Sequence, residues 1–425
     1  MRAKSLALIL ALMLLTAAQA REAWVVQAAG MADLVDADGR SRLQGAPVAA
    51  MLEIEPDALY AAGSAGDYGL IDARGNAVGD GRYEMLEAVG DAVLFRQNGR
   101  YGAMDAEGRV IVQPVWDQLT YAAPGTFLAL SGDLYDDQPD EIVSVNIDGA
   151  RDATGSFTAD GLHPLSDGLM AFMQSNGQYG FVDAQGRQTI PPQWGYASDF
   201  SDGVAIVSDG SHMGLIDAQG AVVIAPQYAW MQRGEGFIAA LTDDGGLDVY
   251  AADGGEKRFT ATETASEAEI CGRYVVLRDE NDACLYDAQG RRLCTLPRTA
   301  LFFPGLNGQV IVADGAWGAP CQYLLNPDGS TVPGRYQRLM PLCGGRYAFL
   351  RWDAGASGYD DARCGLLTDD GRELCPAEYL EILPAGEDRL TLVTESEVLF
   401  TDLDGHALRR WALTETAASS SAAGA

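Results

Sequence analysis

The stretch Tyr179-Gly-Phe-Val-Asp-Ala-Gln-Gly186 decides the fold, because near-copies of it recur along the chain. The clearest further copies are Tyr68-Gly-Leu-Ile-Asp-Ala-Arg-Gly75, Tyr101-Gly-Ala-Met-Asp-Ala-Glu-Gly108 and Met213-Gly-Leu-Ile-Asp-Ala-Gln-Gly220. Weaker copies keep the turn glycine, and the eleven turn glycines are residues 39, 75, 108, 149, 186, 220, 254, 290, 329, 371 and 405. Successive glycines lie 33 to 42 residues apart. A period kept from end to end indicates a tandem-repeat architecture.

Each unit has the features of a β-hairpin. The aromatic-Gly-apolar-apolar segment predicts a short strand, and Asp-Ala-x-Gly predicts a tight turn in which Asp caps the backbone and Gly adopts a positive φ. A second strand follows, as at Ala221-Val-Val-Ile224, and a proline then ends it, as at Pro226. A third strand comes after another turn, as in Phe200-Ser-Asp-Gly-Val-Ala-Ile-Val207. Because no segment shows a sustained helical period with caps, the predicted fold class is all-β.

This unit resembles that of the WG-repeat (KWG) family of bacterial β-repeat proteins. Residues Tyr179 to Val207 match nearly the whole family unit, and the pattern covers most of residues 30–405. The chain departs from the family at the name-giving dipeptide, since Tyr-Gly, Met-Gly or Cys-Gly mostly replaces Trp-Gly. Trp317-Gly318 is the only literal copy among the turn-linked units. The resemblance implies a β-propeller-like or open β-repeat array and a binding role, with no characteristic reaction.

The repeats are compatible with more than one arrangement of their strands. Eleven units of three strands give about 33 strands, which could redistribute into roughly eight four-stranded blades. We predict a propeller-like array over residues 21–412. An open array, and a division into two rings near residues 255–269, are the alternatives.

The first twenty residues predict a signal peptide. Arg2 and Lys4 form a positive n-region, an apolar stretch follows from Leu6 to Leu15, and Ala18-Gln-Ala20 offers a cleavage site. No second such stretch follows, so we expect no membrane span in the mature chain. The expected location is secreted, extracellular or at the cell envelope. Residues 413–425 have the composition of a disordered tail.

The charge of the chain limits the classes of partner. The formal net charge is −31, and loss of Arg2 and Lys4 with the signal peptide would make it −33. Such an acidic surface repels nucleic acid and anionic lipid, and it suits basic partners or polyvalent cations. We therefore expect no nucleic-acid partner. The oligomeric state is not indicated.

All seven cysteines follow residue 270, and six of them form two matching triplets. Within each triplet one pair flanks a hairpin turn, namely Cys284 with Cys294 and Cys364 with Cys375. Because exported thiols tend to oxidise, we predict one disulfide per triplet, with these hairpin pairs as the first choice. Reduced, buried cysteines are the alternative. A zinc site is disfavoured, because no Cys-x-x-Cys motif or nearby histidine is present.

The sequence predicts no catalytic residue and no cofactor. None of the three histidines belongs to a recognisable nucleophile motif, and most aspartates occupy the same turn position in each unit, which a structural role explains. A carbohydrate hydrolase that uses paired carboxylates is the enzymatic alternative. Ca²⁺ is the alternative reading of three turns, Asp36-Ala-Asp38-Gly, Asn326-Pro-Asp328-Gly and Asp402-Leu-Asp404-Gly, although none has the complete Ca²⁺-loop pattern.

Two longer units suggest binding loops, because insertions in repeat arrays often lie on the binding face. Their candidate residues combine aromatic rings with carboxylates, and they are Tyr135, Asp136, Asp137, Trp352, Tyr359, Asp360 and Asp361. The leading hypothesis is a secreted, non-catalytic scaffold that binds a protein or glycan at the cell envelope. A propeller hydrolase and a self-assembling structural array are the alternatives.

Overall fold

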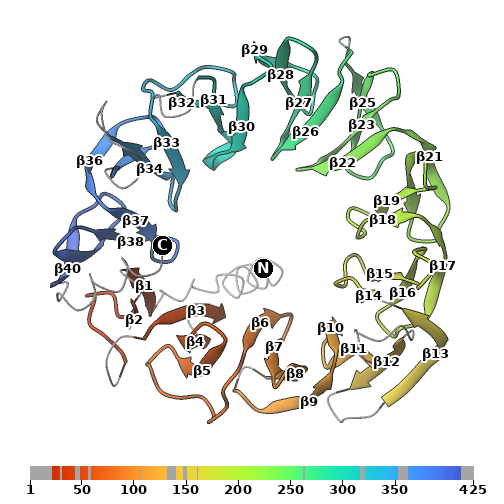
Figure 1. Cartoon of the computed structure of the whole chain (residues 1–425), viewed down its shortest axis with the longest axis horizontal. Coiled ribbons are helices and arrows are strands. Elements are labelled where there is room, and N and C mark those ends of the chain that lie inside the picture. Colours follow the sequence, from red (N-terminus) through yellow and green to blue (C-terminus); the bar gives the residue numbers. More distant parts are fainter. Residues whose placement is uncertain are drawn as a thin grey trace, which may run out of the picture.

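The protein is an all-β ring of small antiparallel sheets. The computed structural model describes residues 22–28, 31–43, 48–55, 59–105, 107–131, 140–146, 151–159, 161–261, 264–315, 321–352 and 362–412. These residues form forty strands and one short 3-10 helix, η1 (Leu306–Gly308), and they contain no α-helix. Figure 1 shows the sheets following one another around the ring in chain order. The prediction of an all-β, propeller-like fold is confirmed.

The first four sheets contain two, three, four and four strands. The first is β1 (Trp24–Ala28) and β2 (Met31–Val35), and the second is β3 (Ala50–Glu55), β4 (Leu59–Ser64) and β5 (Asp67–Asp72). The third is β6 (Met85–Val89), β7 (Ala92–Gln97), β8 (Arg100–Met104) and β9 (Val110–Trp116). The fourth is β10 (Gln118–Ala123), β11 (Thr126–Ser131), β12 (Asp140–Asn146) and β13 (Arg151–Ala159).

Four sheets of four strands follow. They begin with β14 (Gly161–Leu162), β15 (Leu169–Met173), β16 (Tyr179–Asp183) and β17 (Gln188–Trp194), then β18 (Tyr196–Ala197), β19 (Val204–Ser208), β20 (Met213–Asp217) and β21 (Val222–Tyr228). They continue with β22 (Trp230–Gly234), β23 (Phe237–Leu241), β24 (Leu247–Ala251) and β25 (Lys257–Thr260), then β26 (Glu267–Cys271), β27 (Tyr274–Arg278), β28 (Asp282–Asp287) and β29 (Arg292–Pro297).

Three sheets complete the ring, the first with three strands and the others with four. They are β30 (Leu301–Pro304), β31 (Val310–Ala313) and β32 (Gln322–Leu325), then β33 (Arg338–Pro341), β34 (Arg346–Arg351), β35 (Arg363–Thr368) and β36 (Glu373–Tyr379), and finally β37 (Glu381–Pro384), β38 (Leu390–Val393), β39 (Glu397–Thr401) and β40 (Ala407–Ala412). In Figure 1 the first strand of a sheet, such as β22, lies nearest the centre and the fourth, such as β21 or β9, lies outside.

The predicted regrouping into about eight blades was wrong, because each repeat forms its own sheet. Ten sheets of three or four strands form the blades, and the two-stranded sheet β1–β2 lies between the last blade and the first. Each of the ten blades also contains an inner strand that the three-strand unit did not include. In the sheets that begin with β14 and β18 this strand is only two residues long, too short to give a sequence period.

The repeated Asp-x-x-Gly turn joins the third strand of a sheet to its outer strand. In the turn after β20, Asp217 Oδ1 accepts the backbone N–H groups of Gln219 and Ala221, at 2.9 and 2.8 Å. The carbonyl of Asp217 accepts the N–H of Gly220, whose φ is +79°. Asp183 makes the equivalent bonds after β16. The predicted capping role of the turn aspartate is therefore confirmed.

The turn glycine also sets how closely two sheets approach. A Cβ atom added to Gly254, after β24, would lie 2.5 Å from Leu215 Cδ1 of the preceding sheet. Seven other turn glycines lie against the preceding sheet in the same way, namely Gly75 on Arg42, Gly108 on Val78, Gly220 on Ile190, Gly290 on Phe259, Gly329 on Leu293, Gly371 on Val332 and Gly405 on Cys375. The repeated glycine is therefore required by packing as well as by the turn.

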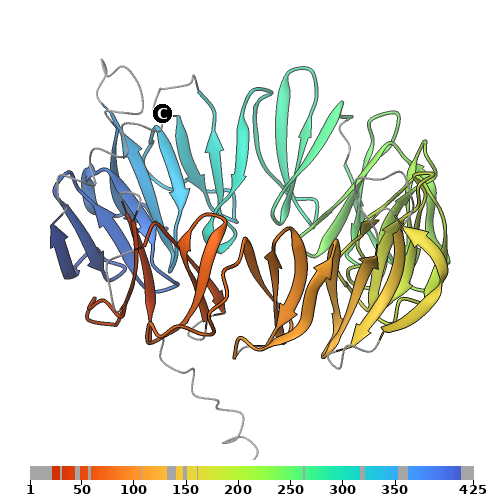
Figure 2. The ribbon, with the colours of Figure 1, turned by 60° about the horizontal axis from the view of Figure 1, so that its bottom comes forward.

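A contact of the same kind, between a turn glycine and a neighbouring sheet, closes the ring. Gly39, in the turn after β2, lies against Arg409 and Phe400 of the last sheet. Trp24 and Phe400 belong to one buried cluster across this junction, and Trp24 Nε1 donates to Asp388 Oδ1 at 2.9 Å. Figure 2 shows the first and last sheets side by side, like the other neighbours around the ring. The array is therefore closed, and not open.

The ring continues through residues 255–269 without a division. Phe237 and Val249 of the sheet before this segment share one buried cluster with Val275 and Tyr286 of the sheet after it. Figure 1 shows a single ring, and the division into two rings that the sequence left open is not observed.

Replacement of Gly254 by alanine tests the packing role of the turn glycine. Gly254→Ala should lower the free energy of unfolding by about 1–2 kcal/mol from the left-handed backbone and by a further ~1–3 kcal/mol from the clash with Leu215. Gly236→Ala is the matched control, because its φ of +79° is similar and no atom lies within 4 Å of its added Cβ. Urea unfolding measures both variants. Equal losses would show that the contact between sheets is unimportant.

Replacement of Trp24 tests the ring closure. Trp24→Ala should cost about 3–5 kcal/mol and should increase amide hydrogen exchange in β1, β2, β38 and β39. Trp194→Ala removes a buried tryptophan from a junction in the middle of the ring, so it should destabilise the protein while leaving exchange in those four strands unchanged. Mass spectrometry after deuterium labelling makes the comparison. The same exchange pattern in both variants would contradict the closure described here.

Candidate functional site

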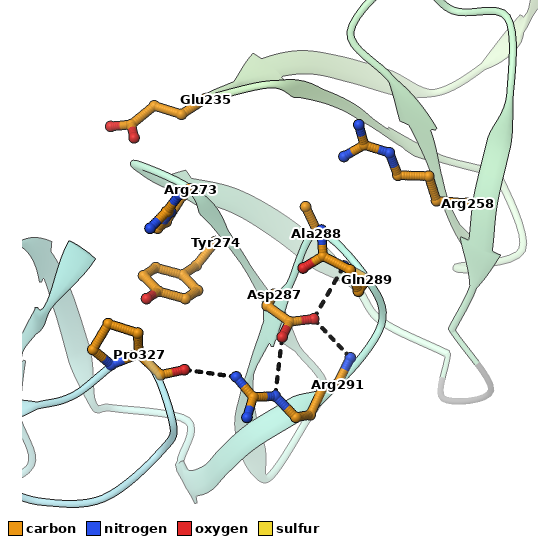
Figure 3. Close-up of a pocket in the computed structure, with 9 residues that line it drawn as sticks. All are labelled: Glu235, Arg258, Arg273, Tyr274, Asp287, Ala288, Gln289, Arg291 and Pro327. Atoms are coloured by element: carbon orange, nitrogen blue, oxygen red, sulfur yellow. Dashed lines mark hydrogen bonds and ion pairs between the residues drawn. The ribbon is translucent and has the colours of Figure 1, made fainter.

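The candidate site is a polar pocket of about 270 Å³ on the face of the ring that carries the repeated turns. Because neighbouring strands are antiparallel, the turn between the first and second strands and the turn between the third and fourth lie on this same face. Three consecutive sheets line the pocket (Figure 3), through Glu235, Arg258, Arg273, Tyr274, Asp287, Ala288, Gln289, Arg291 and Pro327. Three of these nine residues are arginines, in a chain with a net charge of −31.

One wall of the pocket is held by Arg291. Its Nε lies 3.0 Å from Asp287 Oδ2, and its Nη2 donates to the carbonyl of Pro327 at 2.6 Å. Asp287 Oδ1 also accepts the backbone N–H groups of Gln289 and Arg291, as the turn aspartate does in the other repeats. This arginine therefore joins two neighbouring sheets and has a structural role.

The guanidinium groups of the other two arginines are available to bind a ligand. Arg258 in β25 and Arg273 in the turn before β27 are exposed, and neither forms an ion pair or hydrogen bond with another residue of the described ranges. Tyr274 beside them is buried, and its Oη donates to the carbonyl of Gly308. Burial raises the pKa of Tyr274, and the nearby charge of Arg273 acts in the opposite direction. The pocket therefore offers two unpaired guanidinium groups beside one that is already engaged.

A buried network next to Arg258 fixes the outer strand of this wall. Asp248 Oδ2 accepts from Lys257 Nζ and Tyr228 Oη, both at 2.6 Å, and Asp248 Oδ1 accepts from Thr260 Oγ1 at 2.6 Å. Burial by itself raises the pKa of Asp248, but these hydrogen bonds outweigh it and hold the pKa below its ordinary value. Lys257 is thereby directed to the carboxylate, whereas its neighbour Arg258 lines the pocket.

A second surface lies along the inner edge of the ring, where the first strands carry exposed apolar side chains. On β30, Leu301 is 51% exposed and Phe303 is 43% exposed. Leu52 on β3 and Tyr196 on β18 are also exposed. Since apolar groups gain by leaving water, this inner edge can contact a ligand as well as solvent.

The comparison with protein families agrees with the repeat geometry. The family model described as "WG containing repeat" matches residues 179–211 and 213–239, which include the turns after β16 and β20. Two WG repeats therefore lie within residues 179–239. No curated protein matches the chain.

Solved structures that resemble this chain share little sequence with it. BamB from Moraxella catarrhalis is 13% identical, with a TM-score of 0.33, and the match covers 62% of this chain and 91% of that one. A eukaryotic initiation factor is 10% identical, with a TM-score of 0.45 and coverage of 93% and 97%. AztD from Citrobacter koseri is 13% identical, with a TM-score of 0.30 and coverage of 65% and 94%.

Most of the predicted binding residues lie outside the described residues. These are Tyr135, Asp136, Asp137, Tyr359, Asp360 and Asp361. Trp352 is described, and it packs partly buried beside the cluster of β34 and β35, where its carbonyl accepts from Gln337 Nε2 at 3.2 Å. Trp352 therefore has a packing role, and the role of the other six stays a prediction.

The predicted disulfides are not formed, since all seven cysteines are free thiols in the structure. In the first hairpin Cys284 lies opposite Thr295 and Cys294 lies opposite Leu285, so the two sulfurs are on opposite faces of the sheet. In the second hairpin Cys364 lies opposite Tyr379 and Cys375 opposite Leu366, so these two side chains share one face and one buried cluster, where both are free thiols. Burial raises the pKa of Cys294 to about 11 and also raises that of Cys364 and Cys375, which keeps these thiols protonated.

The turns that the sequence left open to Ca²⁺ use their carboxylates within the turn. Asp36 Oδ1 accepts from the N–H groups of Asp38 and Arg40, and Asp402 Oδ1 accepts from those of Asp404 and His406. The described residues contain no group of three or more carboxylate, histidine or cysteine side chains arranged to hold a metal ion. They also contain no helix that is long and apolar enough to span a membrane.

Sequence reasoning missed Arg258 and Arg273, although a signal was present. Both residues stand at positions where the neighbouring repeats have an apolar or small residue. Alignment of the repeats on their turn glycines, followed by a search for charged exceptions, would have found them. The sequence search concentrated on longer loops and on carboxylates, which most repeats share.

The Asp248 network predicts how stability depends on pH. Because the pKa of Asp248 is lowered, its contribution is complete above the ordinary value of 3.8 and is lost as the pH falls through the lower folded value. Asp248→Asn should therefore cost about 1–3 kcal/mol at pH 7 and should weaken the loss of stability below pH 4. Urea unfolding at pH 7, 4 and 3 measures this effect. Asp253→Asn, in the exposed turn of the same sheet, should leave the pH dependence unchanged, and an equal effect would refute the assignment.

Proposed function

We propose that this protein is an exported, non-catalytic binding scaffold whose ring engages a protein or glycan at the cell envelope. The observation that carries this proposal is the exposed apolar pair Leu301 and Phe303 on the inner strand β30. Inner strands β33 and β37 follow in the ring, and Met340 and Leu383 give them partly exposed apolar side chains at the position equivalent to Phe303. Three consecutive blades thus present apolar groups along one edge, as binding surfaces do.

The repeated carboxylates support a scaffold rather than a hydrolase. The turn aspartates cap backbone N–H groups in one repeat after another, as Asp183, Asp217 and Asp287 do. A carboxylate whose lone pairs hold a turn is poorly placed to act as an acid or nucleophile, because a catalytic group must face the substrate. The propeller itself is a rigid frame on which many proteins present a binding surface.

Export is supported by the sequence of residues 1–20, with its basic start, apolar stretch and small-residue cleavage site. Those residues lie outside the described part of the chain. The formal charge of −31 would keep an exported ring soluble, and it favours partners that are neutral or basic over the greater part of their surface.

The test is co-sedimentation of the mature chain (Arg21 onward) with cell-wall and insoluble polysaccharide preparations, together with a parallel assay on purified envelope proteins. We expect saturable binding that the double variant Leu301→Ser, Phe303→Ser weakens at least tenfold. Val222→Ser, Val223→Ser is the matched control, because these valines are 53% and 40% exposed on the outer strand β21. The control should bind like the natural chain, and EDTA should have no effect.

Three results would contradict the proposal. These are the absence of saturable binding to any preparation, an equal loss in the inner and outer variants, and release of soluble sugar from a bound polysaccharide. The first would remove the scaffold role, the second would show that the inner edge is not the binding surface, and the third would indicate a hydrolase.

A further inference from the structure

The arginine pocket differs in charge from the rest of the molecule. The chain has 29 basic and 60 acidic residues, yet the pocket gathers three arginines against two acids. One of these acids, Asp287, is already paired with Arg291. The acidic residues already keep the protein soluble, so solubility does not explain the two unpaired cations Arg258 and Arg273.

Arg273 breaks the pattern of the turns between the first and second strands. In the three sheets that directly precede it this two-residue turn is Asp167-Gly168, Asp202-Gly203 and Glu235-Gly236, an acid followed by glycine, whereas between β6 and β7 it is Gly90-Asp91. In the sheet of β26 and β27 it is Gly272-Arg273. A cation therefore stands where its neighbours have glycine, and the acid is absent.

Arg258 breaks the pattern of the outer strands. In each of the other repeats compared, the bulge residue of the outer strand is apolar or a threonine, and these residues are Ile111, Thr189, Val223, Leu293, Leu374 and Leu408. Arg258 is the equivalent residue of β25, between Lys257 and Phe259 in the ladder. Arginine at this position is therefore an exception among the repeats compared.

The lining of the pocket indicates which anion fits. Guanidinium groups match the oxygens of phosphate, and two unpaired ones can bind a doubly charged group. Glu235 repels a second anionic group but can accept hydrogen bonds from hydroxyls, and the amide of Gln289 can donate to them. Tyr274 is excluded as a ligand, because its hydroxyl is bonded to Gly308.

We propose that this pocket binds a phosphate monoester on a hydroxylated carrier, such as a sugar phosphate, through Arg258 and Arg273. Arg291, tied to Asp287 and Pro327, forms the rigid wall behind the phosphate. The proposal goes beyond the scaffold role, because it gives the ring a second binding site. It concerns the turn face of the ring, whereas the apolar pair on β30 lies on the inner edge.

Isothermal titration of the full mature chain tests the proposal, with inorganic phosphate, glucose 6-phosphate, glucuronate and glucose as probes. We expect one saturable site for the two phosphates, with glucose 6-phosphate bound more tightly, and weaker binding of glucuronate and glucose. Arg258→Val and Arg273→Gly each introduce a residue that another repeat has at that position, so they preserve the fold. Each should weaken binding of glucose 6-phosphate at least tenfold.

Arg187→Gln is the matched control, because Arg187 pairs with Asp183 at 2.7 Å in the turn after β16. It removes the same charge far from the pocket and should leave the affinity unchanged. The proposal is overturned if the natural chain binds neither phosphate, if Arg187→Gln weakens binding as much as the pocket variants, or if glucuronate binds as tightly as glucose 6-phosphate. Failure here with intact, Phe303-dependent co-sedimentation would reject the phosphate site alone. Failure of both would reject the scaffold role.

Discussion

The contact between a turn glycine and the neighbouring sheet, which recurs at nine turns, is the constraint on which the ring depends. A sheet of three or four strands is too small to bury its own apolar faces, so each one needs a neighbour on both sides. The turn glycine lets the backbone of one sheet approach the preceding sheet without an intervening side chain. Because the same turn recurs, the same approach recurs, and a regular ring results.

The sequence predicted the repeat and its turns well, because those depend on local chemistry. An aspartate that caps a turn and a glycine with positive φ leave the same trace in every unit, and the structure has both. The number of blades could not be obtained in this way, because strands of two residues such as β14 and β18 leave no periodic pattern. Their existence depends on pairing with the next strand, which is a tertiary interaction.

The candidate site was less predictable for a related reason. The disulfide prediction followed the spacing of Cys284 and Cys294, but the register of the hairpin decides which face each sulfur takes, and a bulge shifts that register. Arg258 and Arg273 lie on different sheets. They line the same pocket only because the ring packs these sheets side by side. Each arginine differs from the residue type that other repeats have at the equivalent position. In a chain whose repeats are otherwise regular, such a difference indicates a residue with a role of its own.

The way the ring closes has a mechanical consequence. Among the described residues no strand of the first sheet pairs with the last one, and the two ends meet through Gly39, Trp24 and Phe400, by the same kind of contact that joins the other sheets. The closure is therefore made by side-chain packing and one side-chain hydrogen bond, from Trp24 to Asp388, and not by strand pairing. Tension around the ring, such as that from a partner pulling on one blade, is distributed over joints of one kind, and the first and last sheets are held as the interior blades are.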